Sequence, residues 1–395
     1  MKRTLVLFAL MMLVSAAFAQ MKKDRTSAYS YWTKKDLAKA KEYIDKAVAY
    51  PEAATDLKCW LYKGAIYYDI LGSPAKAILA PNALTIAFEA YSKAKELDTK
   101  DEYKPDIASH LAALGGEFFN QGIGFYKENK FDDAIALFEK AISISKSTNT
   151  IDTLANYGEA LCLEKKATSD KAMLDKAIEK YEYLISIKMK EASVYTSLAN
   201  LYKDNGDNEK AEATLVKGKA AFPGNTDIII TEANLYISTN NHAKAIEALK
   251  VAKDKEPNNV SVLYAVGVTY DLLKNDTKLP DDERAKYFTQ AIASYNEALK
   301  IDSNYFDAIF NLGAIYFNKG GEVINEANKL PINETAKFDA MIAEGNGFLN
   351  KALPYLEKCE RMQPQDKGTL ISLKEIYTRL KMDDKLNAIK NKLGK

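Results

Sequence analysis

The chain repeats itself at an interval of 34 residues near its centre. The tetrapeptide 199–202, Ala-Asn-Leu-Tyr, recurs unchanged at 233–236, and the same offset relates Pro223 to Pro257. A fixed interval of 20 to 50 residues is typical of stacked supersecondary units, and an interval of 34 indicates paired helices. Such an array lengthens by adding units rather than by enlarging one core. The length of 395 residues is therefore compatible with a single solenoid.

One unit, residues 192–225, contains every element that a pair of packed helices requires. Small residues allow two antiparallel helices to approach closely, and bulky residues fill the space beside the crossing. A polar turn, 204–207, separates the two helices, and Pro223 closes the unit. The residues that form the two stripes are Tyr195, Leu198, Ala199 and Tyr202 in the first helix, and Ala211, Leu215 and Gly218 in the second.

This pattern resembles the tetratricopeptide repeat (TPR) family across nearly the whole chain after residue 19. The resemblance implies an all-α fold, a right-handed superhelical solenoid of helix-turn-helix repeats with about eight or nine units, partial at both ends, over residues 20–395. One departure is Glu232, at a position where the family prefers an apolar residue. Further units begin their stripes at Trp60, Phe118, Leu154, Ile229, Leu263 and Ile309.

Insertions interrupt the repeat near residues 72–86, 273–285 and 317–346. The longest keeps helical spacing of apolar residues on both sides of Pro331. We therefore predict two helices that extend past the normal repeat and form an extended helical hairpin near the C-terminus. A disordered excursion is the alternative. A Lys-rich segment, 381–395, is expected to give the array a polar end.

Residues 1–19 have the pattern of a secretory signal peptide. Two basic residues precede a short apolar run, and Ala17-Phe18-Ala19 is a small-x-small cleavage site. The alternative is a buried N-terminal helix. We expect an exported protein of the periplasm or cell envelope of a Gram-negative bacterium, with no transmembrane span and possible peripheral association with the envelope. The tripeptide 152–154 is similar to a short O-glycosylation pattern of Bacteroidetes envelopes, and the chain resembles Bacteroidetes envelope TPR proteins.

Composition and motifs argue against several classes of function. Lys+Arg is 55 and Asp+Glu is 54, and this near-neutral balance disfavours nucleic-acid binding. Neither His110 nor His242 has a partner at metal-ligand spacing, and no phosphate-binding glycine loop occurs. We expect no enzyme activity, no cofactor and no metal. The three cysteines, Cys59, Cys162 and Cys359, are expected to be small buried hydrophobes.

The TPR resemblance implies that the first helix of each unit lines a concave groove. Mapped onto this chain, candidate groove residues are the carboxamides Asn120, Asn156, Asn200, Asn234 and Asn311, and the aromatic residues Phe119, Tyr264 and Phe310. A carboxamide can both donate to and accept from a peptide backbone. Alternatively, these residues satisfy helix ends or pack between repeats.

The expected function is a non-enzymatic scaffold that binds a peptide or protein partner in this groove. An alternative is a carbohydrate-binding or small-ligand-binding helical repeat protein at the outer membrane. An enzyme with an unrecognised site is a third.

Overall fold

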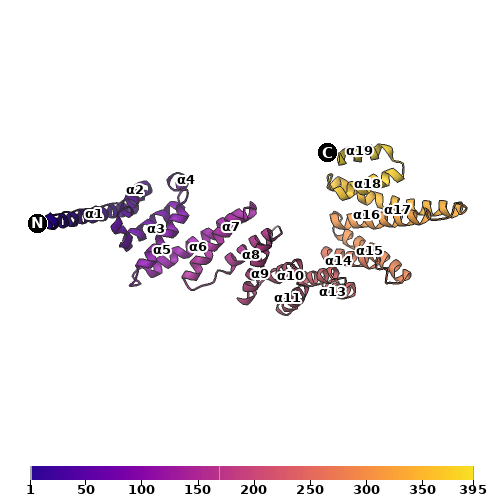
Figure 1. Cartoon of the computed structure of the whole chain (residues 1–395), viewed down its shortest axis with the longest axis horizontal. Coiled ribbons are helices and arrows are strands. Elements are labelled where there is room, and N and C mark those ends of the chain that lie inside the picture. The colour runs from indigo at the N-terminus through magenta and orange to yellow at the C-terminus, as the bar shows by residue number, and fades with distance from the viewer. Residues whose placement is uncertain (1, 169, 395) are drawn as a thin grey trace. The chain divides into compact units, whose positions relative to one another are not determined.

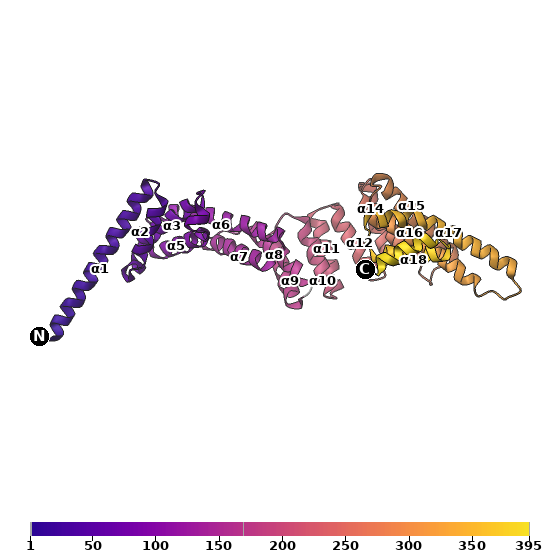
Figure 2. The same cartoon turned by 90° about the horizontal axis from the view of Figure 1, so that it is seen from above.

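The computed structural model describes residues 2–168 and 170–394, with side chains from residue 16 onward. Within these residues it consists of the helices α1–α19 and one short 3-10 helix, Pro51–Thr55, and contains no strand. The predicted all-α helical-repeat solenoid is confirmed. The chain divides into two compact units, Met1–Met189 and Lys190–Lys395, each of which is a row of helical hairpins (Figures 1 and 2).

In the first unit, consecutive helices pack in pairs: α1 with α2, α3 with α5, α6 with α7, and α8 with α9. The short helix α4 occupies the predicted insertion between α3 and α5. The bounds are α1 Lys2–Thr33, α2 Leu37–Val48, α3 Leu57–Leu71, α4 Lys76–Leu79, α5 Ala83–Leu97, α6 Lys104–Lys127, α7 Phe131–Ser147, α8 Thr153–Ala167 and α9 Lys171–Ser186.

The second unit continues the same scheme with α10–α11, α12–α13, α14–α15, α16–α17 and α18–α19. Its bounds are α10 Ala192–Asp204, α11 Asn208–Ala221, α12 Thr226–Ser238, α13 His242–Lys255, α14 Val260–Leu273, α15 Asp281–Ile301, α16 Phe306–Ala327, α17 Thr335–Met362, α18 Lys367–Arg379 and α19 Asp383–Leu393.

Both ends of the array are more complete than the partial units expected from the sequence. The later part of α1 packs on α2, with Met21 and Ala28 fully buried. At the other end, α19 buries Leu386 and Ile389 against α18 and leaves polar residues outside. The first helix was overlooked because α1 continues from the apolar segment 5–14 without a turn that would mark a new element.

In the repeats without an insertion, the same type of turn joins the two helices. A residue with positive φ follows the first helix in five hairpins, and the next amide donates to the carbonyl five residues earlier, as in Asp207 N–H to Tyr202 O at 2.8 Å. This is the Schellman geometry that ends a helix and reverses the chain. The five residues with positive φ are Lys35, Asn129, Gly206, Asn240 and Lys381.

In the hairpins α3–α5, α6–α7, α14–α15 and α16–α17, a glycine of the first helix faces a large residue of the second. A Cβ added to Gly64 would lie 2.8 Å from the ring of Tyr91, and one added to Gly267 would lie 2.6 Å from Tyr295. Both rings are fully buried. The close helix crossing predicted from the small residues is therefore observed, and the bulky partner fills the space that the missing side chain leaves.

The recurring tyrosines near the end of the first helices link successive repeats. The hydroxyl of Tyr236 donates to Glu212 of the preceding second helix at 2.9 Å, and Tyr377 donates to Glu357 at 3.1 Å. Tyr67 makes the same bond to Asp45 at 2.7 Å. Burial, followed by the acceptor carboxylate, raises the pKa of all three phenols. These three tyrosines have a structural role, because each forms a hydrogen bond between one repeat and the next.

The extended hairpin near the C-terminus is formed by α16 and α17. The helices cross closely at Gly320 and Gly345, where a Cβ on Gly320 would lie 2.9 Å from the Gly345 carbonyl oxygen. Beyond this crossing, Val323, Ile324 and Ala327 are buried, whereas most of 331–340 is exposed. The two extended helices predicted around Pro331 are confirmed. Among the described residues, no helix has the length and apolar character needed to cross a membrane.

Candidate functional site

The first helices of neighbouring repeats lie against one another and form one face of each unit. In the second unit, α10 contacts α12, α12 contacts α14, α14 contacts α16, and α16 contacts α18. In the first unit, α6 contacts α8. All eight residues predicted from the groove pattern belong to these first helices, which are α6, α8, α10, α12, α14 and α16.

Three of the five predicted asparagines present exposed carboxamides. Asn200 on α10 and Asn234 on α12 occupy equivalent positions on adjacent helices, two residues before the recurring tyrosine. Asn120 on α6 is also exposed. Among the hydrogen bonds within the described part of the chain, none engages these three carboxamides. They therefore remain able to bond to another molecule.

The other two asparagines are held by their own surroundings. Asn156 is buried, and its Nδ2 donates to the Asp152 carbonyl at 2.7 Å. The Nδ2 of Asn311 donates to the hydroxyls of Tyr264 and Tyr295, at 3.2 and 3.3 Å. Both side chains therefore take the packing arrangement that was the alternative to groove binding. Sequence spacing alone could not separate these two cases, because all five asparagines lie on first helices.

The predicted aromatic residues are half-buried between neighbouring helices. The Phe119 ring lies 5.7 Å from Phe138, and Tyr264 lies 5.3 Å from Tyr305 in an edge contact. Phe310 stacks on Phe306 at 6.3 Å. Each ring keeps only part of its surface available to a partner.

An apolar strip crosses the second unit, and the groove residues predicted from the sequence include two of its four members, Tyr264 and Phe310. Six residues before each recurring tyrosine of α12, α14, α16 and α18 stands an apolar side chain. Its members are Ile230, Tyr264, Phe310 and Ile371. Ile371 is exposed and the others are half-buried. The insertions shift the interval away from 34 after Tyr270, so the 34-residue period alone does not relate Ile230 to Phe310 or Ile371.

Glu232 has a partner that explains its departure from the family pattern. Its carboxylate is buried in α12, and Lys219 of the preceding helix α11 donates to it. A carboxylate in this position requires a cation, since an unpaired buried charge is strongly destabilising. The ion pair is therefore a link between consecutive repeats rather than a reactive group.

The remaining chemistry-bearing residues are packed. The His110 ring lies 4.7 Å from Tyr91 in a stacked arrangement, and its Nδ1 lies 2.9 Å from the Asp106 carbonyl. All three cysteines are free and buried, and burial raises the pKa of each thiol to about 12. In the described residues, no group of three or more potential metal ligands occurs.

Similarity to known structures is found across much of the chain. The Pseudomonas aeruginosa pilF structure is 14% identical, covering 65% of this chain and 94% of its own, with a TM-score of 0.42. TTC0263, a TPR protein of Thermus thermophilus, is 19% identical over 49% of this chain and 94% of its own, with a TM-score of 0.37. YrrB, described as a TPR protein with an unusual peptide-binding site, is 18% identical over 56% and 97%, with a TM-score of 0.35. No curated protein sequence matches the chain.

Family models match three segments. A model described as TPR repeat matches residues 287–320, and one described as Tetratricopeptide repeat matches residues 26–53. A third, described as Tetratricopeptide repeat protein 21 ARM repeat, matches residues 120–279. The segments at 26–53 and 287–320 lie in different compact units. The chain therefore contains tetratricopeptide repeats in both of its units.

Proposed function

We propose that this protein is a non-enzymatic scaffold of the bacterial cell envelope, and that the first helices of its second unit bind an extended segment of a protein partner. The observation that carries the proposal is the pair Asn200 and Asn234. They lie at equivalent positions on the contacting helices α10 and α12, and both are exposed. Neither is held by the internal bonds that engage Asn156 and Asn311.

This pair suits the backbone of an extended peptide better than a particular side chain. Each carboxamide offers an acceptor oxygen and two donor hydrogens, so it can bond both polar groups of a peptide unit. The apolar strip that starts at Ile230 supplies a surface for side chains of the same segment. Each carboxamide–backbone bond contributes about 0.5–1.5 kcal/mol. The loss of both is expected to weaken binding by about tenfold or more.

Site-specific photocrosslinking in cells tests this surface. A photoreactive residue at Thr231, one turn from Asn234 on α12, should capture a defined partner. The same probe at Val251, which is exposed on the second helix α13, is the matched control. Adding Asn200→Ala and Asn234→Ala should reduce capture at Thr231. Equal capture at both probe sites, or capture that the two alanines leave unchanged, would contradict binding by the first helices.

Carbohydrate binding, the second candidate, requires a cluster of exposed aromatic rings. Among the described side chains, the exposed rings are Phe18, Tyr29, Tyr183 and Phe338. They belong to the separate helices α1, α9 and α17. This distribution favours the protein partner over a sugar.

Export remains part of the proposal, and the packing of α1 is compatible with it. Among the described side chains, which start at residue 16, Phe18, Ala19 and Gln20 are exposed and Met21 is the first that is buried. Met21 contacts Cys59. Cleavage after Ala19 would therefore keep the buried residues Met21 and Ala28 in the mature chain. N-terminal sequencing of the protein from an envelope fraction should begin at Gln20. An intact Met1, or recovery in the cytosol alone, would count against export.

A further inference from the structure

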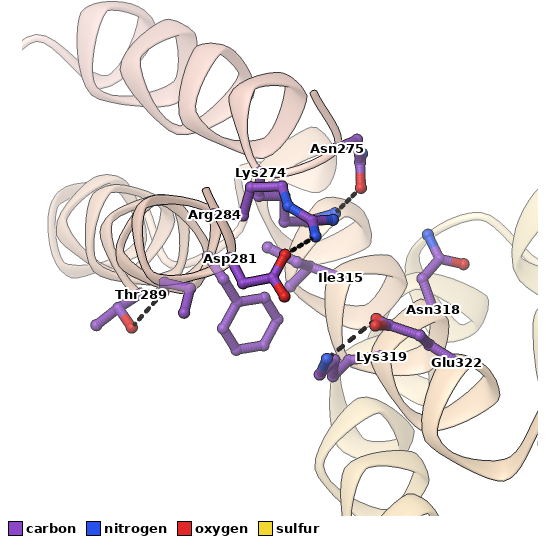
Figure 3. A pocket seen from close by; sticks show the side chains of 11 residues that line it. Lys274, Asn275, Asp281, Arg284, Thr289, Ile315, Asn318, Lys319 and Glu322 are labelled. Carbon is purple, nitrogen blue, oxygen red and sulfur yellow. Dashed lines mark hydrogen bonds and ion pairs between the residues drawn. The ribbon is translucent and has the colours of Figure 1, made fainter. Parts of the chain in front are cut away.

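Two insertions that are separate in the sequence meet in the second unit. Residues of the 273–285 insertion at the end of α14 and the start of α15 face residues of the 317–346 insertion on α16 (Figure 3). They line a cavity of about 780 Å³. Insertions in repeat arrays gather on one face, which is often a binding face. Most of the charged residues that line this cavity therefore belong to segments that the repeat itself does not require.

Near the cavity lie three ion pairs, one at each of α14, α15 and α16. Lys274 lies 2.9 Å from Asp271 on α14, and Lys319 lies 3.1 Å from Glu322 on α16. Arg284 pairs with Asp281 on α15. All three pairs join residues three apart in the sequence, and no dashed line of Figure 3 crosses the cavity between α16 and the other two helices. Within residues 170–394, no ion pair joins α16 to α14 or α15 across the cavity.

The cations lie deeper than the anions that accompany them in the cavity wall. The side chains of Lys274, Arg284 and Lys319 are 12%, 35% and 35% exposed. By contrast, the side chains of Asp281 and Glu322 are 91% and 62% exposed. A pair of this kind between exposed groups on one helix is weak and is easily exchanged for another anion.

The wall of the cavity also contains apolar surface. Ile315 is buried, and Phe288 is half-buried in edge contacts with Tyr316 and Phe348. Phe288 and Ile315 both line the cavity. An apolar surface beside three amino and guanidino groups matches a ligand with an apolar body and a negative charge.

We propose that this cavity binds a small organic carboxylate with an apolar body. The carboxylate accepts hydrogen bonds from Arg284 and from Lys319 or Lys274, and it replaces the exposed intrahelical partners Asp281 and Glu322. The body of the ligand packs on Phe288 and Ile315. This site is distinct from the surface of Asn200 and Asn234, so its occupancy is independent of the proposed peptide binding.

Ligand-observed fluorine NMR of fluorobenzoate with the full chain tests the proposal. The resonance should broaden in the presence of the wild-type protein at millimolar ligand. The variant Arg284→Met/Lys319→Met should weaken binding by about tenfold or more, since hydrogen bonds to charged groups are lost. The matched control is Lys337→Met. Lys337 lies on the same hairpin as Lys319, outside the cavity, and forms an exposed ion pair with Glu334, three residues before it. This control should bind as the wild type does.

Two further ligands separate the two features of the site. Fluorobenzamide, which keeps the ring and lacks the charge, should bind at least about tenfold more weakly than fluorobenzoate. Inorganic sulfate should compete only weakly, because it lacks an apolar body. Equal binding of the amide, or equal competition by sulfate, would overturn the proposed ligand class. Absence of broadening with the wild type, or an equal loss in Lys337→Met, would overturn the site itself.

Discussion

Phe138 of α7 lies between two glycines that belong to consecutive first helices. A Cβ added to Gly122 of α6 or to Gly158 of α8 would lie 2.7 Å from the Phe138 ring. The ring is fully buried and cannot leave without opening a cavity. Substitution of Gly158 by alanine therefore tests whether this close approach holds the two repeats together.

Two opposing effects determine the sign of the change. Alanine in place of glycine within a helix stabilises it by about 0.5–1 kcal/mol. Crowding of a packed core costs about 1–3 kcal/mol. We expect Gly158→Ala to destabilise the α6–α8 region by about 1 kcal/mol. Gly116→Ala on α6 is the matched control, because no atom lies within 4 Å of its added Cβ. It should stabilise by about 0.5–1 kcal/mol.

Hydrogen exchange read by mass spectrometry is the suitable assay, because repeat arrays open locally rather than as one unit. Gly158→Ala should speed exchange of amides in α7 and α8 by about fivefold, and Gly116→Ala should slow it in α6. In a Phe138→Leu background, the cost of Gly158→Ala should shrink or vanish. If both alanines slow exchange in the wild-type background, the contact with Phe138 does not limit packing and the reasoning is refuted.

Three further outcomes follow from the contacts between repeats. Lys219→Met should lower the free energy of unfolding by about 2 kcal/mol, because it leaves the buried carboxylate of Glu232 without a cation. The loss is smaller than for a fully buried pair, since the Lys219 side chain is 41% exposed. Urea denaturation should show that the double variant Lys219→Met/Glu232→Met regains most of the lost stability. The three thiols should resist iodoacetamide at pH 8 while folded, since their raised pKa of about 12 keeps them protonated, and should react rapidly in urea. Asp56→Ala should cost about 1–2 kcal/mol and speed exchange in the first turn of α3, because Asp56 caps the Cys59 amide at 2.9 Å and pairs with Arg25.

The regular repeats were predictable because their packing repeats with the sequence. Small residues such as Gly267 and bulky residues such as Tyr295 occupy fixed places in each unit, so local spacing reports a contact between neighbouring helices. The extended hairpin was predictable for the same reason, since apolar spacing continues on both sides of Pro331. The first helix of the array was not, because α1 runs on from the apolar segment 5–14 with no internal turn to mark a new element.

The candidate site was only partly predictable. Spacing placed five asparagines on first helices, but it could not tell the exposed Asn200 from Asn311, which is held by Tyr264 and Tyr295. That distinction depends on side chains from other repeats. The cavity between the two insertions depends still more on long-range contact, since Arg284 and Lys319 belong to different hairpins.

The amino-acid sequence alone predicts the helical repeat, the register of its core residues and the positions of the insertions. These properties follow from contacts within one hairpin or between adjacent ones, which a 34-residue period records directly. The contacts between repeats establish which polar residues are engaged, such as Glu232 with Lys219, and which remain open. The cavity between the two insertions has the same origin, because these segments share no sequence period and meet only where the α14–α15 hairpin stacks on the α16–α17 hairpin.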